Sequence, residues 1–513
     1  MSDVKKEIIF ANSMTIDKRN PDLAYLRKNC FRAETKGLYP AKDFYQENPD
    51  DLTTSDDIVD ILGSEEETYD IKVITENGGN LLFNNLGSNS SSNTTLTGVS
   101  YECGVFGNDG VHIVASNDQL YKVQHANSNT TSQWTFTDAT PDIAGFDGLY
   151  YWYLSNAEIY RQLGAGTPTI AFNNLGLLPR FVSFLGDQMV IFCEDAGSIV
   201  VLFWDKSDAD LFDKRIIVKN ARLVAAGVVD GRLMLVKSVG NSSNAKEQDG
   251  QLVLTEYDGE KFVRVNAIKT GDKDISYERT TGVAVGSEVM VFSIEGNTDS
   301  HNTSLYKDYV FKVYADGSIE VLFEPDETTY GDIHIVRIFY NFICIAHEGT
   351  GSTPPVIWIN EETNNEYDDF EDYTTTEYIT NFMCEPYNDH QLDGFSVAFE
   401  KIFEQTDAGA TPPTGEELDV YYRVSERDEF TLLMNVTALK VKENVNASRD
   451  QSTEYATDDG LGLPEQRYMV TTMPDNTSLP RFNEIQFKFV PKRGFSIIGA
   501  WFSYSYISRN TLT

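Results

Sequence analysis

In the middle of the chain, a short polar turn is followed several times by a run in which apolar residues dominate or alternate with polar ones. The first copy is Asn108-Asp109-Gly110 followed by Val-His-Ile-Val-Ala, and the turns recur at intervals of 38, 40, 43, 56 and 55 residues. A drifting period of this size, built from strands and turns, is typical of a β-propeller. The later turns are Asp147-Gly148, Gly186-Asp187, Asp230-Gly231, Gly286-Ser287 and Tyr340-Asn341.

Most copies carry a second turn, which would give each repeat two hairpins and therefore four strands. Upstream, Asn77-Gly78-Gly79 separates two alternating runs and predicts a further hairpin. Together these signals predict an all-β fold with a propeller of about six or seven blades over residues 66–371. A set of β-meanders in a sandwich or barrel is the alternative. The second turns are Ser116-Asn117-Asp118, Ser155-Asn156, Ala196-Gly197, Asp258-Gly259 and Asp316-Gly317.

The pattern changes on both sides of the repeats. Residues 1–65 are polar and interrupted by prolines, so we expect an extended arm that packs on the rest of the molecule or wraps around a neighbour. Acids cluster over residues 50–67. Residues 372–513 hold longer alternating runs, which predict a separate antiparallel β-sandwich. Polar inserts near 240–250 and 296–307 predict surface loops.

The charge balance restricts the partners of the protein. The chain has 79 acidic and 41 basic residues, a net charge of -38. Such a surface is soluble and repels nucleic acid and anionic membranes. It is either a solvated or salt-adapted surface, or one that must not adhere to passing DNA. The start, Met-Ser-Asp-Val-Lys-Lys-Glu, lacks an apolar segment, so no signal peptide is expected, and no apolar run is long enough to span a membrane.

No residue pattern points to catalysis, a cofactor or a metal, and we expect that the protein is not an enzyme. The five cysteines are too scattered for a disulfide framework or zinc site, and Cys193 and Cys344 lie in apolar runs that predict reduced core residues. The histidines lack metal-ligand spacing. The cysteines are Cys30, Cys103, Cys193, Cys344 and Cys384, and the histidines are His112, His125, His301, His334, His347 and His390.

Three weaker features also fit plain structural roles. An acidic stretch could bind calcium, but a solvated turn fits it better because the EF-hand glycine and terminal glutamate are missing. The basic residues of the arm could meet an acidic face of a neighbouring subunit. Three tryptophans could bind sugars, although their apolar surroundings favour the core. These sets are Asp205, Asp208, Asp210 and Asp213; Lys18, Arg19, Arg27, Lys28 and Arg32; and Trp134, Trp152 and Trp204.

The last hundred or so residues carry a resemblance. The succession Tyr421-Tyr-Arg-Val-Ser425, Phe430-Thr-Leu-Leu433, Arg481-Phe-Asn-Glu-Ile-Gln-Phe-Lys-Phe489 and Ile498-Gly-Ala-Trp-Phe-Ser-Tyr-Ser-Tyr506 is similar to the end of many minor tail proteins of tailed phages. With the arm and the propeller, the order of parts resembles the propeller-type tail nozzle of short-tailed phages. No functional residue is carried over by this resemblance.

The resemblance implies a structural virion protein, made in the host cytoplasm. It implies a cyclic, hexameric homo-oligomer beneath the portal and adaptor, through which DNA leaves without specific binding. A carboxylate-lined conduit would repel the phosphate backbone, and residues 50–67 are candidates for its lumen or rim. Two alternatives stay open. A sugar- or receptor-binding propeller needs clustered exposed aromatic side chains, and a propeller hydrolase needs a cluster of acids with raised pKa.

Overall fold

The structure is a computed structural model in which almost every element is a β-strand. In the part of the chain that it describes there is one helix, α1 (Glu327–Tyr330), and no helix there is long and apolar enough to cross a membrane. Two compact units are formed, one by residues 1–43, 318–322 and 364–513 and the other by residues 44–317 and 323–363. The described residues are 4–14, 23–31, 38–40, 44–48, 52–63, 71–86, 94–123, 130–137, 139–207, 210–239, 251–269, 283–284, 289–294, 309–324, 326–339, 342–361, 376–383, 389–401, 416–437, 468–472, 479–491 and 495–507.

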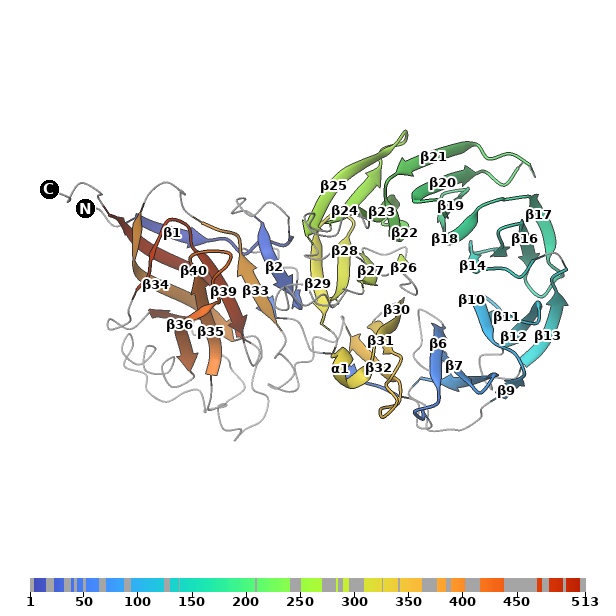
Figure 1. Ribbon diagram of the computed structural model, residues 1–513, viewed down its shortest axis with the longest axis horizontal. Helices are drawn as coiled ribbons and strands as arrows, with labels where there is room; N and C mark the ends of the chain where they lie inside the picture. Colours follow the sequence, from blue (N-terminus) through green and yellow to red (C-terminus); the bar gives the residue numbers. More distant parts are fainter. Residues whose placement is uncertain are drawn as a thin grey trace, which may run out of the picture. The chain divides into compact units, whose positions relative to one another are not determined.

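The second unit is a ring of blades, which confirms the predicted all-β propeller (Figure 1). Its first five blades are four-stranded antiparallel sheets in which strand order follows the sequence. They are β6 (Asp57–Leu62), β7 (Lys72–Asn77), β8 (Asn80–Asn85) and β9 (Thr94–Thr97); β10 (Tyr101–Gly107), β11 (Gly110–Ala115), β12 (Gln119–Val123) and β13 (Thr130–Thr135); β14 (Ile143–Phe146), β15 (Tyr150–Leu154), β16 (Glu158–Leu163) and β17 (Thr169–Asn173); β18 (Leu178–Leu185), β19 (Gln188–Asp195), β20 (Ser198–Trp204) and β21 (Lys214–Lys219); and β22 (Arg222–Val229), β23 (Arg232–Val239), β24 (Gln251–Tyr257) and β25 (Phe262–Lys269).

Two further blades bring the total among the described residues to seven, the upper of the two predicted values. The sixth contributes β26 (Val283–Ala284), β27 (Val289–Ile294) and β28 (Tyr309–Tyr314) to this unit, while most of β29 (Ile319–Phe323) groups with the first unit. The seventh consists of β30 (Ile333–Phe339), β31 (Phe342–His347), β32 (Val356–Glu361) and β5 (Tyr45–Gln46). Its outer strand β5 therefore comes from the N-terminal part of the chain, where Gln46 pairs with Trp358 and Tyr45 with Ile359.

Turn chemistry explains why the hairpins form where the sequence predicts them. Both central residues have positive φ in three two-residue turns: Gly78 and Gly79 (57° and 77°), Ala196 and Gly197 (44° and 81°), and Asp230 and Gly231 (46° and 71°). Such turns match the twist of the strands they join. The turns Gly286-Ser287 and Tyr340-Asn341 lie outside the described residues.

Two predicted second turns occupy a different place in their blades. Asp258-Gly259 and Asp316-Gly317 connect the third and fourth strands, whereas the other second turns connect the second and third. The reason is that the polar inserts, residues 240–250 and 295–308, stand between the second and third strands of these two blades. The inserts themselves lie outside the described residues.

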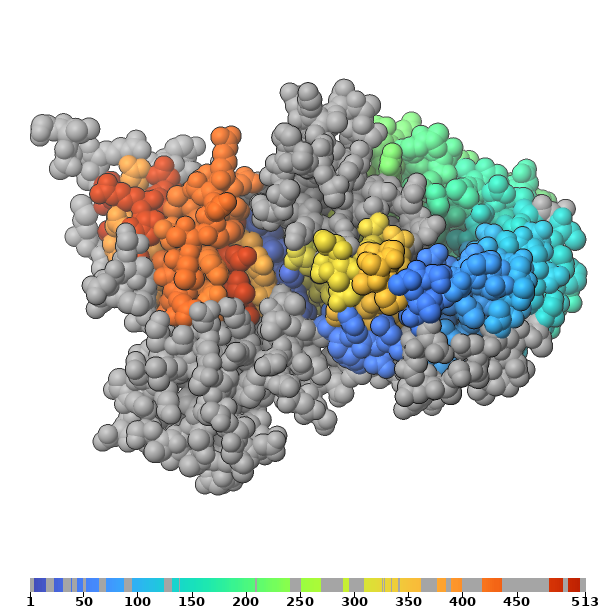
Figure 2. Space-filling model, turned by 60° about the horizontal axis from the view of Figure 1, so that its bottom comes forward, coloured from blue at the N-terminus to red at the C-terminus, as the bar shows by residue number. Residues whose placement is uncertain are grey.

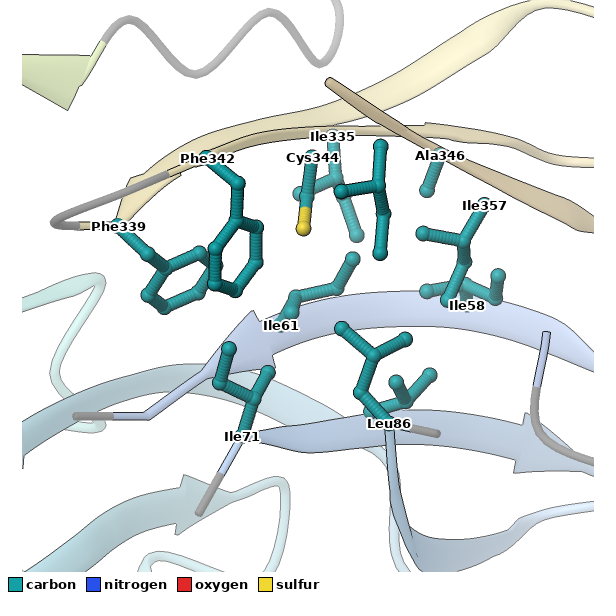
Figure 3. Close-up of a cluster of buried hydrophobic side chains, with 12 residues drawn as sticks. Ile58, Ile61, Ile71, Leu86, Ile335, Phe339, Phe342, Cys344, Ala346 and Ile357 are labelled. Atoms are coloured by element: carbon teal, nitrogen blue, oxygen red, sulfur yellow. The ribbon is translucent and has the colours of Figure 1, made fainter. Parts of the chain in front are cut away.

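The ring closes where the seventh blade meets the first. Apolar side chains of both blades form one buried cluster, shown in Figure 3, in which Ile61 and Ile71 of the first blade face Phe339, Phe342 and Cys344 of the seventh. The innermost strands β30 and β6 are in contact, and in Figure 2 the seventh blade, in yellow, lies directly beside the first, in blue. A blade has two apolar faces, so each face needs a neighbour to cover it.

A buried carboxylate reinforces this closure. Asp60 of β6 accepts a hydrogen bond from Arg337 of β30 at 2.5 Å, and the Tyr101 hydroxyl of β10 donates to its other oxygen. Asp60 is 4% exposed. One side chain thus links the seventh, first and second blades, and both partners satisfy a charge that would be costly to bury alone.

The first unit consists mainly of two sheets, in which the strands are antiparallel except for the parallel pair β2 and β29. One has the order β1 (Val4–Ile8), β40 (Phe495–Tyr506), β34 (His390–Lys401) and β37 (Tyr468–Thr472), with β38 (Arg481–Phe482) pairing with β34. In the other, β29 is followed by β2 (Ala24–Lys28), β33 (Glu377–Thr380), β39 (Gln486–Pro491), β35 (Glu416–Arg423) and β36 (Thr431–Thr437). The short strands β3 (Cys30–Phe31) and β4 (Tyr39–Pro40) pair with each other.

Aromatic rings from these two sheets contact each other. Phe487 of β39 lies 4.9 Å from Phe395 of β34 and 5.2 Å from Phe502 of β40, measured between ring centroids. Phe10, which follows β1, packs on Tyr378 and Phe489 of the second sheet. The predicted β-sandwich over residues 372–513 stays an interpretation, and residues 1–43 contribute strands to the same unit.

The described part of residues 1–65, predicted as an arm, supplies six strands, four of which pair with strands outside the segment. In order, β1 pairs with β40, β2 with β33 and β29, β5 with β32, and β6 opens the first blade. Arg27 of β2 is fully buried, and its Nε donates to Glu320 of β29 at 2.7 Å. Its guanidinium also donates to the Ala11 and Cys30 carbonyl oxygens and to Asn12. This part of the chain therefore contributes strands to the sheets of both units.

Replacing Asp60 tests the contribution of the closing carboxylate. We expect Asp60→Ala to lower the free energy of unfolding of the propeller by about 3 kcal/mol, because Arg337 would lose its buried partner. Asp57→Ala, on the same strand but exposed, serves as the matched control and should change it by less than about 0.5 kcal/mol. Urea unfolding followed by the fluorescence of the buried Trp152 and Trp204 measures both. Equal effects of the two substitutions would show that Asp60 does not hold the ring closed.

Candidate functional site

Two groups of titratable side chains come together in the first three blades. One is a buried network between the second and third blades around His112. The other is a set of carboxylates around Glu102. Each joins residues from different blades, so the ring as well as local spacing brings them together.

The network around His112 begins at the turn between β10 and β11. His112 Nε2 lies 3.2 Å from Oδ1 of Asp109, outside hydrogen-bond geometry, and its ring stacks on Tyr151 of the next blade at 4.0 Å between centroids. Lys122 Nζ lies 2.7 Å from Oδ2 of Asp109, and the Tyr151 hydroxyl donates to Oδ1. The Asp109 carboxylate thus bonds Lys122 of its own blade and Tyr151 of the next blade, and lies close to His112.

The other side of the imidazole faces a hydrogen-bond chain. Gln162 Nε2 donates to the Gly166 carbonyl oxygen at 2.7 Å, so the Gln162 amide oxygen faces Tyr153, whose hydroxyl donates to it at 2.8 Å. That hydroxyl then accepts from Nδ1 of His112, also at 2.8 Å. The proton of the neutral imidazole is therefore assigned to Nδ1, and Nε2 carries none.

Burial sets the protonation of these groups. It lowers the pKa of His112 to about 4, against the opposing attraction of Asp109. Burial raises the pKa of Tyr151 and of Tyr153. Burial would also raise the pKa of Asp109, but hydrogen bonds from Lys122 and Tyr151 outweigh it and leave that pKa lowered. At neutral pH the network holds a neutral imidazole, two phenols and a paired carboxylate.

This arrangement fits a structural role better than catalysis. His112 and Tyr153 are fully buried, so a substrate does not reach them in this conformation. Gly107 is packed just as tightly, because a Cβ atom at this position would lie 2.4 Å from the Tyr151 ring. The network therefore holds the second and third blades together through polar contacts.

The carboxylate set lies at the ends of strands in the first three blades. Glu102 of β10 is exposed, and partial desolvation raises its pKa, followed by repulsion from Asp142, Asp118 and Glu76. Desolvation also raises the pKa of Asp142. Asp118 accepts from the Thr140 hydroxyl, and Glu76 accepts from Ser100 at 2.8 Å. Two members of this set, Glu102 and Asp142, have the raised pKa that the hydrolase alternative needs, and sequence reasoning missed the set because its four acids come from three blades.

The histidines and cysteines named from the sequence are dispersed. His112, His347 and His390 are buried in the second blade, the seventh blade and the first unit, respectively. Cys193 and Cys344 are buried free thiols, which confirms their predicted role in the core. Cys30 and Cys103 are also buried and free. His125, His301, Cys384 and the side chain of His334 lie outside the described residues.

The acidic stretch that could suggest calcium is a turn bonded to itself. The backbone N–H of Asp205 donates to Asp213 at 2.5 Å, and the Ser207 N–H and hydroxyl donate to Asp205 at 2.8 and 2.6 Å. Asp208 lies outside the described residues. Within the residues that the structure describes, no group of three or more histidine, cysteine or carboxylate side chains is placed to hold a metal ion.

The basic and aromatic candidates have mainly internal roles. Arg27 is buried in its ion pair with Glu320 and does not face a neighbouring subunit, a correction to the expected basic patch. Lys18, Arg19 and Arg32 lie outside the described residues. Trp152 and Trp204 pack on each other in the propeller core at 5.9 Å, as their apolar surroundings predicted. Trp134 on β13 is 36% exposed.

The acidic residues 50–67, expected at a lumen or rim, are partly internal. Asp60 is buried at the ring closure, and Asp56 is buried in a turn where it accepts from Thr53 and Asn77. Asp57 is exposed, and Asp50, Asp51 and residues 65–67 lie outside the described residues. Asp56 and Asp60 therefore do not line a lumen or rim as expected, because their carboxylates are bonded to neighbouring side chains and backbone inside the fold.

Comparisons with known proteins give only distant similarities. No protein-family model and no curated protein matches the chain. Among solved structures, "YCF48 bound to D1 peptide" is 11% identical with a TM-score of 0.43, covering 64% of this chain and 98% of that one. The WD40 domain of Toxoplasma gondii coronin is 11% identical with a TM-score of 0.42, covering 64% and 89%. A chain of the mitotic checkpoint complex is 10% identical with a TM-score of 0.42, covering 62% and 90%.

The pH dependence of stability tests the neutral imidazole. The unfolded chain binds a proton at His112 near pH 6.5, but the folded protein does so only near pH 4. The stabilisation is therefore complete above pH 6.5 and lost as the pH falls toward 4, by up to about 3 kcal/mol. We expect His112→Gln to lose less stability than the unmodified protein over this window, in urea unfolding at pH 7.5, 6 and 5. A steeper loss in the variant would mean that Asp109 keeps His112 protonated.

Proposed function

We propose that this protein is a structural part of the tail of a tailed phage, a nozzle or neck ring that forms part of the DNA-ejection conduit. The observation that carries the proposal is the set of C-terminal segments similar to phage minor tail proteins. These segments lie on β35, β36, β39 and β40, which belong to one unit. The propeller provides a ring-shaped scaffold whose blades share geometry but no repeated chemical group.

Charge supports the same proposal. The net charge of -38 makes contact with the phosphate backbone unfavourable, and a conduit for DNA needs a surface that does not retain it. The subunits of such a ring would meet head to tail through two different surfaces. The partners are therefore other copies of the chain and the tail or portal-adaptor proteins above and below the ring.

A propeller that binds sugars or a receptor is less well supported. Such a site needs several exposed aromatic side chains on one face. Trp152 and Trp204 are buried, which leaves Trp134 as the exposed member of the three tryptophans considered.

A propeller hydrolase has one observation in its favour, the carboxylates around Glu102. Glu102 and Asp142 are both exposed, and their pKa values are raised first by partial desolvation, as in any crowded acidic surface. Hydrolysis of a glycoside would need one protonated and one ionised carboxyl group on either side of the bond. If this candidate were right, Glu102→Gln would abolish the hydrolysis of a sugar substrate by the purified protein.

Particles that lack the protein test the conduit. We expect them to package DNA but to fail to retain or eject it normally, and the supplied protein should restore ejection. Light scattering of the purified protein, alone and with its tail partners, should show a cyclic oligomer. A stable monomer both free and inside particles, or normal ejection without the protein, would contradict the proposal.

A glycan array separates the conduit from the sugar-binding alternative. The conduit predicts no specific hit, because one half-exposed tryptophan does not make a sugar platform. A specific hit that is lost in Trp134→Ala, but kept in Tyr45→Ala, would favour the alternative. Tyr45 is the matched control because it is exposed to the same degree on another outer strand, β5.

A further inference from the structure

The outer strand of the fourth blade carries three basic residues and no acidic one. β21 has the sequence Lys-Arg-Ile-Ile-Val-Lys, whereas β9, β13 and β17 contain no basic residue and the outer strand β25 contains two, Arg264 and Lys269. On β21 the residues alternate in burial, with Ile216 and Val218 packed against the fifth-blade core and Arg215, Ile217 and Lys219 exposed. One face of this strand therefore presents charge, apolar side chain and charge at successive outward positions.

The exposed face has no acidic residue directly opposite it on β20, and Asp195 stands one strand further away, on β19. In the register with β20, Arg215 pairs with Leu202, Ile217 with Val200 and Lys219 with Ser198. Among the described residues, no carboxylate forms an ion pair with Arg215 or Lys219. Ile217 is 51% exposed. This is an unusual combination in a chain with 79 acidic and 41 basic residues.

The backbone of β21 is also open. β21 is the last strand of its sheet, so half of its N–H and C=O groups point away from β20. Figure 1 shows it along the outer rim of the ring. Lysine on an edge strand can protect it against unwanted pairing, but such protection does not require the exposed Ile217 between Arg215 and Lys219.

At two places elsewhere in the described chain, a strand from the N-terminal segment covers the edge of a sheet. β5 is added to β32, and β2 lies beside β29, where Asn29 N–H donates to the Val321 carbonyl oxygen at 2.8 Å. At the second of these edges charge selects the partner, because Arg27 of the added strand pairs with Glu320 of the edge strand. On β21 the signs are reversed, with the basic residues on the edge strand.

From these features we infer that β21 binds an extended acidic segment of a partner protein, which adds a fifth strand to the fourth blade. Main-chain hydrogen bonds would provide the affinity, and the outward side chains Arg215, Ile217 and Lys219 would provide the specificity for an acidic segment. The segment would carry acidic residues two positions on either side of an apolar residue, opposite Arg215, Lys219 and Ile217. This interaction concerns the rim of the propeller and does not depend on the role in a phage tail.

A labelled peptide tests the inference on the full-length protein. The probe is a capped fluorescein peptide with the pattern Glu-Thr-Val-Thr-Glu, measured by fluorescence anisotropy at low and physiological salt. We expect saturable binding that weakens about tenfold or more in Arg215→Glu/Lys219→Glu, because two attractive contacts become repulsive. The matched control Arg264→Glu, an exposed arginine on the outer strand β25, should bind like the unmodified protein.

Three further measurements separate strand addition from charge attraction alone. The charge-reversed variant should bind the peptide in which lysine replaces glutamate, which shows that the variant is folded and that charge selects. N-methylation of alternate peptide nitrogens should abolish binding. Equal binding by the N-methylated peptide would overturn strand addition. Absence of binding at low salt, or binding of oligothymidylate in place of the peptide, would overturn the acidic partner.

Discussion

Closure of the ring is the constraint on which the rest of the structure depends. A blade is apolar on both faces, so seven blades leave two uncovered faces unless the last one reaches the first. The shared cluster around Ile61 and Phe342 covers them, and Asp60 fixes the inner strands by bonding Arg337 and Tyr101. The outer strand of the closing blade, β5, comes from the start of the chain, so closure needs a contact between segments about three hundred residues apart.

The strands of the N-terminal segment pair with strands from distant parts of the sequence. β1 pairs with β40 near the other end of the chain, β2 carries the buried Arg27, and β5 and β6 belong to the propeller. Arg27 sits at a point where a wrong register would leave a charge without a partner, which is costly in a dry interior. Both compact units therefore incorporate residues from this one polar segment.

Local turn chemistry made the propeller predictable. Pairs such as Asp230-Gly231 adopt left-handed backbone that few residues accept, and the strand pattern follows at once. The strands β1 and β5 were not predictable, because Val-Lys-Lys-Glu-Ile and Tyr-Gln carry no strong pattern and depend on distant partners. The same holds for the contacts that the groups around His112 and Glu102 make with residues of other blades, such as Tyr151 and Asp142, because no spacing in the sequence indicates them.

In the function proposed above, the surfaces of the protein rather than a catalytic group carry its role. Quantitative mass spectrometry of tailed-phage particles purified from the source of this chain tests that proposal most directly. We expect the protein to be present in every particle, in a copy number that fits a cyclic ring and close to that of the other tail-ring proteins. Its absence from particles in which the portal and tail proteins are detected would contradict this role.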